Sequence, residues 1–179
     1  VYKDNKVIVV DSKCASMGMG LLVYNAAEKK KDGLTIDELA EWVTEARDNL
    51  CHWFTVNDLF YLKRGGRVSQ AAADFGTMLN IKPVLHVDKE GRLIPVEKIR
   101  GRRQSLDSLV NHMEKTALNA KDQVIFISHG DCLEDAEYVK KQIQKSLSPK
   151  KIHMNYIGPI VGSHSGPGTV ALFFIGSEK

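Results

Sequence analysis

The chain has 179 residues, a mass of 20.0 kDa and a formal net charge of +3 at pH 7. Hydrophobic residues make up 43% of the sequence, which is enough for a packed core and excludes a largely disordered chain. The small charge is spread along the chain and does not indicate nucleic-acid binding, and no apolar stretch has the length needed to cross a bilayer.

The opening part of the chain predicts a strand followed by two helices. Residues 6–10 (KVIVV) have the short, apolar character of a buried strand. Residues 15–31 predict a helix that Gly33 ends, because glycine readily adopts the left-handed conformation found after helices. Thr35 and Glu38 have the spacing of a capping box, and the apolar residues after them recur at helical spacing up to residue 50.

An aromatic stretch and a glycine pair organise the next part of the chain. Residues 51–56 (CHWFTV) predict a strand, and a short helix follows from residue 57 or 58 to just before Gly65. Ser69 is then placed to cap a further helix at 71–79.

Two extended runs, at 81–87 and 92–99, predict a hairpin with Gly91 in its turn. Pro83 and Pro95 have no backbone N–H, which indicates that these strands pair at an edge or with interruptions. The elements that follow alternate, with predicted helices at 102–119 and 131–147 and predicted strands at 123–128, 151–157 and 169–175.

The order of these elements predicts the α/β class, with a mixed sheet of parallel and antiparallel strands and flanking helices. The hairpin supplies antiparallel strands, and the strand–helix–strand run supplies a right-handed parallel crossover. The change from a helix-rich opening to an aromatic strand places a domain boundary near residue 50. It divides the chain into residues 1–50 and 51–179.

The three cysteines, Cys14, Cys51 and Cys132, show no spacing typical of a disulfide or a metal site. An odd number of scattered thiols is typical of a reducing compartment, so we expect a cytoplasmic protein with no metal centre. Cys132 follows a His-Gly-Asp sequence, which would suit a Cys/His nucleophile. The same sequence is also a common strand-to-helix turn with Asp131 as the cap, and we expect that structural role.

A glycine- and proline-rich segment, GPIVGSHSGPGT at residues 158–169, is the most informative in the chain. Gly166 and Gly168 allow sharp turns and a close approach of the backbone to a ligand. His164, Ser165 and Thr169 add polar side chains suited to a carboxylate or a phosphate. The segment therefore predicts an anion-binding corner beside a buried strand, with a tight structural turn as the alternative.

A second cluster, YLKRGGRVS at residues 61–69, carries two arginines around a glycine pair. Gly65 and Gly66 free the backbone, so that Arg64 and Arg67 can both point into one space. Arginine suits bidentate contact with a carboxylate or a phosphate. A solvated basic loop is the alternative.

Five motifs together resemble the DegV family of bacterial fatty-acid-binding proteins. They are VVDS-x-x-AS-x-G at residues 9–18, DL-x-YLKRGGRVS at 58–69, NIKPVL at 80–85, IRGRR at 99–103 and GP-x-x-GSHSGPGT at 158–169. They extend from about residue 6 to residue 175, in register with the family. Its members are longer, so the resemblance implies that residues 1–50 are the incomplete end of a first α/β domain. Residues 51–179 would then be a second, lipid-binding α/β domain.

The resemblance implies a carrier without catalytic residues of its own. Such proteins bury a long-chain fatty acid in an apolar tunnel and present its carboxylate to a separate kinase subunit, which makes an acyl phosphate. His164, Ser165 and Thr169 would contact the head group, and Arg64 and Arg67 would steady its charge. Arg100, Arg102 and Arg103 would lie on the surface that meets the kinase, and Gly65, Gly66, Gly166 and Gly168 would shape the loops. The resemblance implies no cofactor besides the bound fatty acid.

An enzyme is the alternative that the residues themselves leave open. The same two clusters could bind a phosphorylated small metabolite, with His164 as general acid or base. The basic run KIRGRR at 98–103 could also indicate a nucleic-acid-binding or regulatory module. It comes without a recognisable reading motif or a continuous basic stripe, so we rank that interpretation last.

Overall fold

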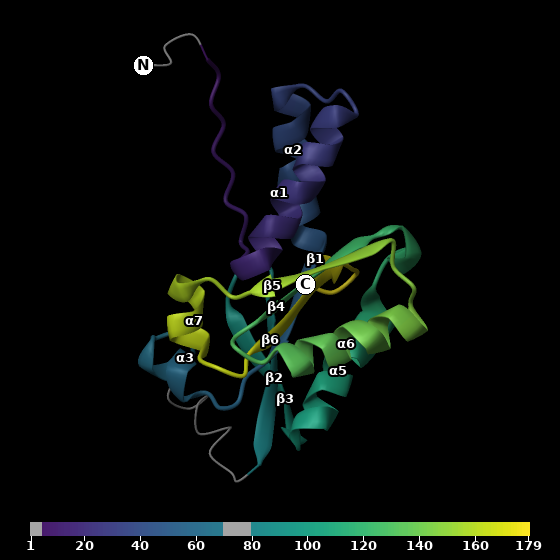
Figure 1. Ribbon diagram of the computed structural model, residues 1–179. Helices are drawn as coiled ribbons and strands as arrows, with labels where there is room; N and C mark the ends of the chain where they lie inside the picture. Colours follow the sequence, from purple (N-terminus) through teal and green to yellow (C-terminus); the bar gives the residue numbers. More distant parts are fainter. Residues whose placement is uncertain (1–4, 70–79) are drawn as a thin grey trace.

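The computed structural model describes residues 5–69 and 80–179. Within these residues, six strands form one mixed sheet with helices on both of its faces (Figure 1). The strands are β1 (Leu50–Thr55), β2 (Ile81–Val87), β3 (Leu93–Arg100), β4 (Val124–His129), β5 (Lys151–Tyr156) and β6 (Val170–Ile175). They lie in the order β3-β2-β1-β6-β4-β5, and β4 pairs with β5 in parallel while the other neighbours are antiparallel. The predicted α/β class with a mixed sheet is confirmed.

The helices begin and end mostly where the sequence predicts. They are α1 (Ser16–Lys31), α2 (Ile36–Ala46), α3 (Phe60–Arg64), α5 (Arg102–Thr116), α6 (Leu133–Ser146) and α7 (Pro159–Ser165), with short 3₁₀ turns η1 (Arg47–Asn49) and η3 (Ala120–Asp122). The capping box before α2 is present: the Glu38 N–H donates to Thr35 Oγ1 over 3.4 Å, and the Thr35 N–H donates to Glu38 Oε2 over 2.8 Å. These two bonds satisfy backbone groups that a helix start otherwise leaves open.

Alternating side chains of each strand build a separate core on each face of the sheet. On β6, Leu172 and Phe174 pack on the face covered by α5 and α6, whereas Phe173 packs on the opposite face. Leu21 and Leu22 of α1 belong to that second core together with strand residues. The first helix therefore packs on the same sheet as the rest, and the division of the chain at residue 50 stays a prediction.

The hairpin of β2 and β3 is confirmed, and its prolines lie where pairing is irregular. Pro83 pairs with Lys98, and a register shift falls between Val84 and Leu85, the residue that pairs with Pro95 on the edge strand β3. The Pro83 carbonyl accepts a hydrogen bond of 2.8 Å from the Thr55 hydroxyl of β1. Edge position and irregular pairing accommodate residues that cannot donate an N–H.

The predicted strand at residues 6–10 is wrong for this structure. The segment is extended but belongs to no strand, and Val7 and Val9 are 77% and 92% exposed. A strand needs a partner backbone, and none of the described residues offers one. The helix predicted at 102–119 ends earlier, at Thr116. The helix predicted at 71–79 after Ser69 lies outside the described residues.

The predicted loop at residues 158–169 contains a helix that sequence reasoning missed. Helix α7 begins at Pro159, and Gly158 is its N-cap. Proline favours the first position of a helix because its fixed backbone angle suits the helix and its missing N–H is not needed there. This placement of Pro159 was the available signal. Within the described residues, no helix combines the length and the apolar character that a membrane span requires.

Candidate functional site

The two glycine-rich clusters pack against each other, although about a hundred residues separate them in the sequence. A Cβ atom added at Gly65 would lie 2.2 Å from Nδ1 of His164, and one added at Gly166 would lie 2.5 Å from the Tyr61 ring. Each glycine therefore leaves the space that a side chain of the other cluster occupies. Gly66 is different. It has a φ of +71°, but no atom lies within 4 Å of an added Cβ.

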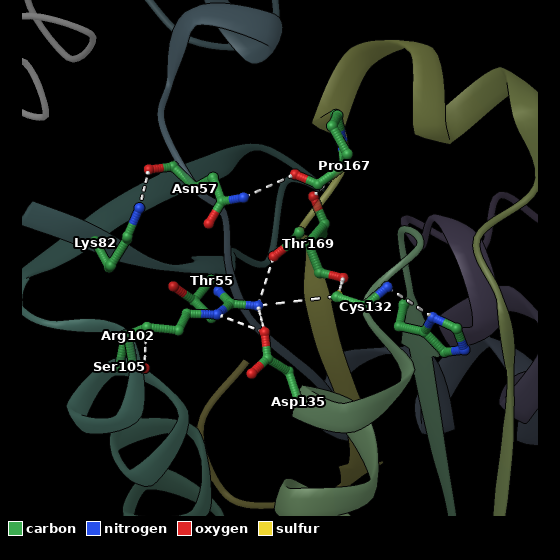
Figure 2. A network of polar contacts seen from close by, with 12 residues as sticks. Thr55, Asn57, Lys82, Arg102, Ser105, Cys132, Asp135, Pro167 and Thr169 are labelled. Atoms are coloured by element: carbon green, nitrogen blue, oxygen red, sulfur yellow. Dashed lines mark hydrogen bonds and ion pairs between the residues drawn. The ribbon is translucent and has the colours of Figure 1, made fainter. Parts of the chain in front are cut away.

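Polar contacts hold the end of the glycine- and proline-rich segment 158–169, where β6 begins. Gly168 has a φ of +78°, and an added Cβ would lie 2.0 Å from Nδ2 of Asn57. The Asn57 amide donates to the Pro167 carbonyl over 3.4 Å, and the Asn57 carbonyl accepts a bond of 3.1 Å from Lys82 Nζ (Figure 2). These contacts tie the segment after α7 to the loop after β1.

Arg102 braces the same segment from the opposite side. Its Nε donates to Asp135 Oδ2 over 2.8 Å, and its Nη2 donates to the Gly168 carbonyl over 2.6 Å. Figure 2 shows the guanidinium between α6 and the backbone beside Thr169. The Arg102 side chain is only 21% exposed. We therefore propose Arg102 as a positioning residue for the glycine-rich segment, in place of a residue free to meet a partner.

Replacing Arg102 with glutamine is expected to lower the free energy of unfolding by about 1–3 kcal/mol, because Asp135 and the Gly168 carbonyl lose their charged donor. Urea unfolding would measure the loss. Arg103→Gln is the matched control, because Arg103 is exposed and lies 3.6 Å above the Tyr138 ring. An exposed cation–π contact contributes about 0.5–1 kcal/mol. Equal losses in both variants would contradict the bracing role.

A cavity of about 310 Å³ lies between one face of the sheet and the helices α1, α3 and α7. Its wall is mainly apolar and includes Phe54 of β1, Ala171 and Phe173 of β6, and Val161 of α7. Its volume falls at the lower end of the roughly 300–1,000 Å³ typical of small-molecule sites. The polar residues in the wall are Ser16, His52, Arg67, His164, Ser165 and Thr169.

Four residues predicted for the head group, namely Arg67, His164, Ser165 and Thr169, thus line one cavity. Arg64 does not line it; its guanidinium lies over the rings of Phe60 and Tyr61, at 5.7 and 5.1 Å from their centroids. Arg100 and Arg103 are exposed, at the end of β3 and the start of α5, and are also absent from the cavity wall.

The polar groups at the α7 end of the cavity differ in whether their hydrogen-bond donors already have partners within the protein. The Thr169 hydroxyl has one hydrogen, which it can donate to the carbonyl of Ser165 or of Gly166, at 3.0 and 2.9 Å. Its hydrogen must leave these carbonyl oxygens before the hydroxyl can donate to a ligand. The Ser165 hydroxyl is buried and has no hydrogen-bond partner in the described part of the chain. Arg67 Nη1 donates to the Gly65 carbonyl over 2.5 Å. Within residues 5–69 and 80–179, this is the hydrogen bond that the Arg67 guanidinium makes.

His52 of β1 is a cavity residue that sequence reasoning missed. Its Nδ1 lies 3.1 Å from the Leu50 carbonyl, which can only accept, so we assign the ring proton to Nδ1 and leave Nε2 as an acceptor. Burial lowers the pKa of His52 to about 3; the positive charge of Lys179 adds to this effect, and the bond to Leu50 opposes it. The imidazole is therefore neutral. The available signal was its position in a strand whose alternate residues face this core.

Gly18 of α1 makes room for His52, because an added Cβ there would lie 2.1 Å from His52 Nε2. The His52 ring also meets Phe173 edge-on, with centroids 5.3 Å apart. Among the described residues, no group of three or more His, Cys, Asp or Glu side chains could hold a metal ion. The chemistry available in the cavity is thus apolar contact, hydrogen bonding and the positive charge of Arg67.

Comparison with known proteins identifies the family. The family model described as "Uncharacterised protein, DegV family" matches residues 1–177. The chain belongs to the DegV family. A DegV domain-containing protein of Clostridium perfringens, CPE0026, is 48% identical over 178 residues, which are 99% of this chain and 61% of that relative. The chain therefore spans less than two thirds of the length of that DegV relative.

Solved structures of the DegV family share the fold. A DegV family protein from Thermus thermophilus, described by its fatty acid binding, superposes with a TM-score of 0.87 at 28% identity, over 97% of this chain and 62% of that one. The fatty acid binding DegV family protein SAG1342 from Streptococcus agalactiae superposes with a TM-score of 0.83 at 28% identity, over 99% of this chain and 62% of that one. The resemblance of the sequence to the DegV family is thus confirmed.

Proposed function

We propose that this chain forms part of a fatty-acid-binding protein, with the acyl tail in the cavity described above and the carboxylate at its polar end. The observation that carries the proposal is the division of this cavity. Phe54, Ala171 and Phe173 supply an apolar wall, whereas Arg67, His164 and Ser165 supply polar groups from α7 and the loop after α3. The fatty acids bound by the two DegV family proteins from Thermus thermophilus and Streptococcus agalactiae support the same ligand class.

The tail would provide most of the binding free energy. Each methylene group removed from water contributes about 0.8 kcal/mol, so a long acyl chain contributes roughly ten kcal/mol before the costs of association. The aromatic wall residues offer contact area without competing hydrogen-bond donors.

The polar end would fix the orientation of the ligand. The guanidinium of Arg67 favours the ionised form of a nearby carboxylate, and serine and histidine side chains can donate hydrogen bonds to it. A carboxylate left among apolar residues would lose its hydration without replacement. The arrangement therefore favours entry with the tail toward Phe173 and the head toward α7.

We further propose that the protein is a cytoplasmic carrier, without catalysis of its own, that presents the carboxylate to a partner kinase. The resemblance to the DegV carriers supports this partner. Arg100 and Arg103 are exposed and remain assigned to the docking surface, while Arg64 is proposed to act at the mouth of the cavity rather than in its wall.

The test is mass spectrometry of the protein purified from bacterial cells, first under native conditions and then after denaturation. A long-chain fatty acid that is retained natively and released on denaturation is the expected result. A protein that carries no lipid and takes up no added fatty acid would contradict the proposal. Turnover of a phosphorylated small metabolite, abolished by His164→Ala, would support the enzyme alternative instead.

A further inference from the structure

The sequence motif NIKPVL at residues 80–85 supplies no residue of the cavity wall, although it is one of the five motifs that carry the family resemblance. The motif begins β2, the strand beside β1 in the sheet. Its one charged residue is Lys82, whose Nζ donates to the Asn57 carbonyl over 3.1 Å, in the loop that follows β1. A hydrogen bond from a charged donor is stronger than one between neutral groups. Lys82 therefore fixes the backbone of this loop at Asn57.

The Asn57 side chain in turn holds the glycine-rich segment. Its Nδ2 donates to the Pro167 carbonyl over 3.4 Å (Figure 2). Proline has no N–H, so the carbonyl is the one backbone group through which a hydrogen bond can hold this residue. The fit is also steric, because a Cβ added at Gly168 would lie 2.0 Å from Asn57 Nδ2. The Asn57 amide thus occupies the space that Gly168 leaves.

The turn held by Asn57 lies between two residues of the cavity wall. Ser165 and Thr169 flank the turn at residues 166–168, and both line the cavity. Gly166 and Gly168 each have a φ of +78°, so the backbone bends sharply on both sides of Pro167. A shift of Pro167 would therefore change how the two flanking side chains face the cavity.

We propose that Asn57, fixed by Lys82, is a positioning residue that acts on the head group of the acyl ligand without contacting it. Neither residue belongs to the cavity wall. The inference rests on the proposed function and gives the motif at residues 80–85 a role in it. The tail is independent of this contact, because Phe54 and Ala171 of the apolar wall are held by the pairing of β1 with β6. Loss of the Asn57 amide should therefore affect the head group and spare the tail.

The test compares two probes with the same tail, oleate and oleyl alcohol, by isothermal titration calorimetry on the protein freed of lipid. Asn57→Ala removes the amide that holds Pro167. We expect oleate to bind about three- to tenfold more weakly, the effect of one lost hydrogen bond, and oleyl alcohol to bind within about twofold of the unchanged protein. Urea unfolding of each variant establishes that it is folded under the conditions of the titration.

Variants of Lys82 test the second part of the inference. Lys82→Met removes the ammonium group from an unbranched side chain and should weaken oleate about three- to tenfold. Lys82→Arg keeps a charged donor and should restore the affinity for oleate to within about twofold of the unchanged protein. Lys63→Met is the matched control, because Lys63 is an exposed residue of α3 outside the cavity wall. It removes the same charge and should change oleate affinity by less than about twofold.

Three results would overturn the inference. They are an equal loss for both probes in Asn57→Ala, which would mean a structural role only, an unchanged oleate affinity in that variant, and a Lys82→Arg variant that binds oleate no better than Lys82→Met. In each case the unchanged protein still binds both probes, so the proposed function stands. If the unchanged protein binds neither probe, the proposed function fails and this inference fails with it.

Discussion

Replacing Gly166 with alanine should lower the free energy of unfolding by about 2–6 kcal/mol, from two separate causes. Gly166 has φ +78° and ψ +171°, a backbone region that only glycine occupies readily, at a cost of about 1–3 kcal/mol for other residues. The added Cβ would also lie 2.5 Å from Cδ2 and 2.7 Å from Cγ of Tyr61. Forcing apart two packed segments costs about 1–3 kcal/mol more.

Urea unfolding of the Gly166→Ala variant measures this loss, and Gly66→Ala separates its two causes. Gly66 also has a positive φ, of +71°, but nothing lies within 4 Å of an added Cβ. The control should lose only about 1 kcal/mol, from backbone strain alone.

Because Tyr61 lies on α3 beside the cavity, Gly166→Ala should also weaken the binding of a fatty acid such as oleate. Losses of the same size in both variants would show that the contact with Tyr61 is not tight.

Acidification should destabilise the protein through His52. An unfolded chain protonates this imidazole below about pH 6.5, whereas burial keeps the folded side chain neutral down to a pKa of about 3. Between these values the unfolded state binds more protons, so the free energy of unfolding falls as the pH falls. From pH 7 to pH 4 the expected loss from this residue is about 3 kcal/mol.

The variant His52→Gln isolates that contribution. At pH 7 the difference from the unchanged protein reports the packing lost beside Phe173 and Gly18. The way this difference changes between pH 7 and pH 4 reports protonation of His52, because the other titrating groups are common to both proteins. Urea midpoints at the two pH values are sufficient. We expect the variant to lose about 3 kcal/mol less than the unchanged protein on acidification. Parallel curves would mean that His52 is accessible to protons in the folded state.

Local patterns in the sequence predicted most of the elements. The capping box of Thr35 and Glu38, the hairpin around Gly91 and the strand at 123–128 depend on residues close together in the chain, and their signals are correspondingly clear. The two glycine-rich clusters also predicted a long-range contact. Their match to one family indicated that both clusters belong to the same site. The interlocking of Gly65 with His164 shows why those positions hold glycine.

The rest depended on tertiary contacts that no local pattern contains. Residues 6–10 have the composition of a strand, but a strand forms only where another backbone pairs with it. Arg102 stands in a basic run that predicts an exposed patch, yet its guanidinium is held by Asp135 and the Gly168 carbonyl. His52 and Ser16 belong to the cavity wall only because β1 and α1 meet there, and their neighbours in the sequence do not indicate it.

The brace formed by Arg102 also connects the two sides of the sheet. Arg102 opens α5, which packs on the face away from the cavity, while Gly168 directly precedes the cavity residue Thr169. Arg103, which we propose for the docking surface, is the next residue of the same helical turn. A protein that docks there and shifts the first turn of α5 would thereby shift the backbone at the entrance to β6. Occupancy of the proposed lipid site and docking on the far side of the sheet would then be thermodynamically coupled through the Arg102 guanidinium group.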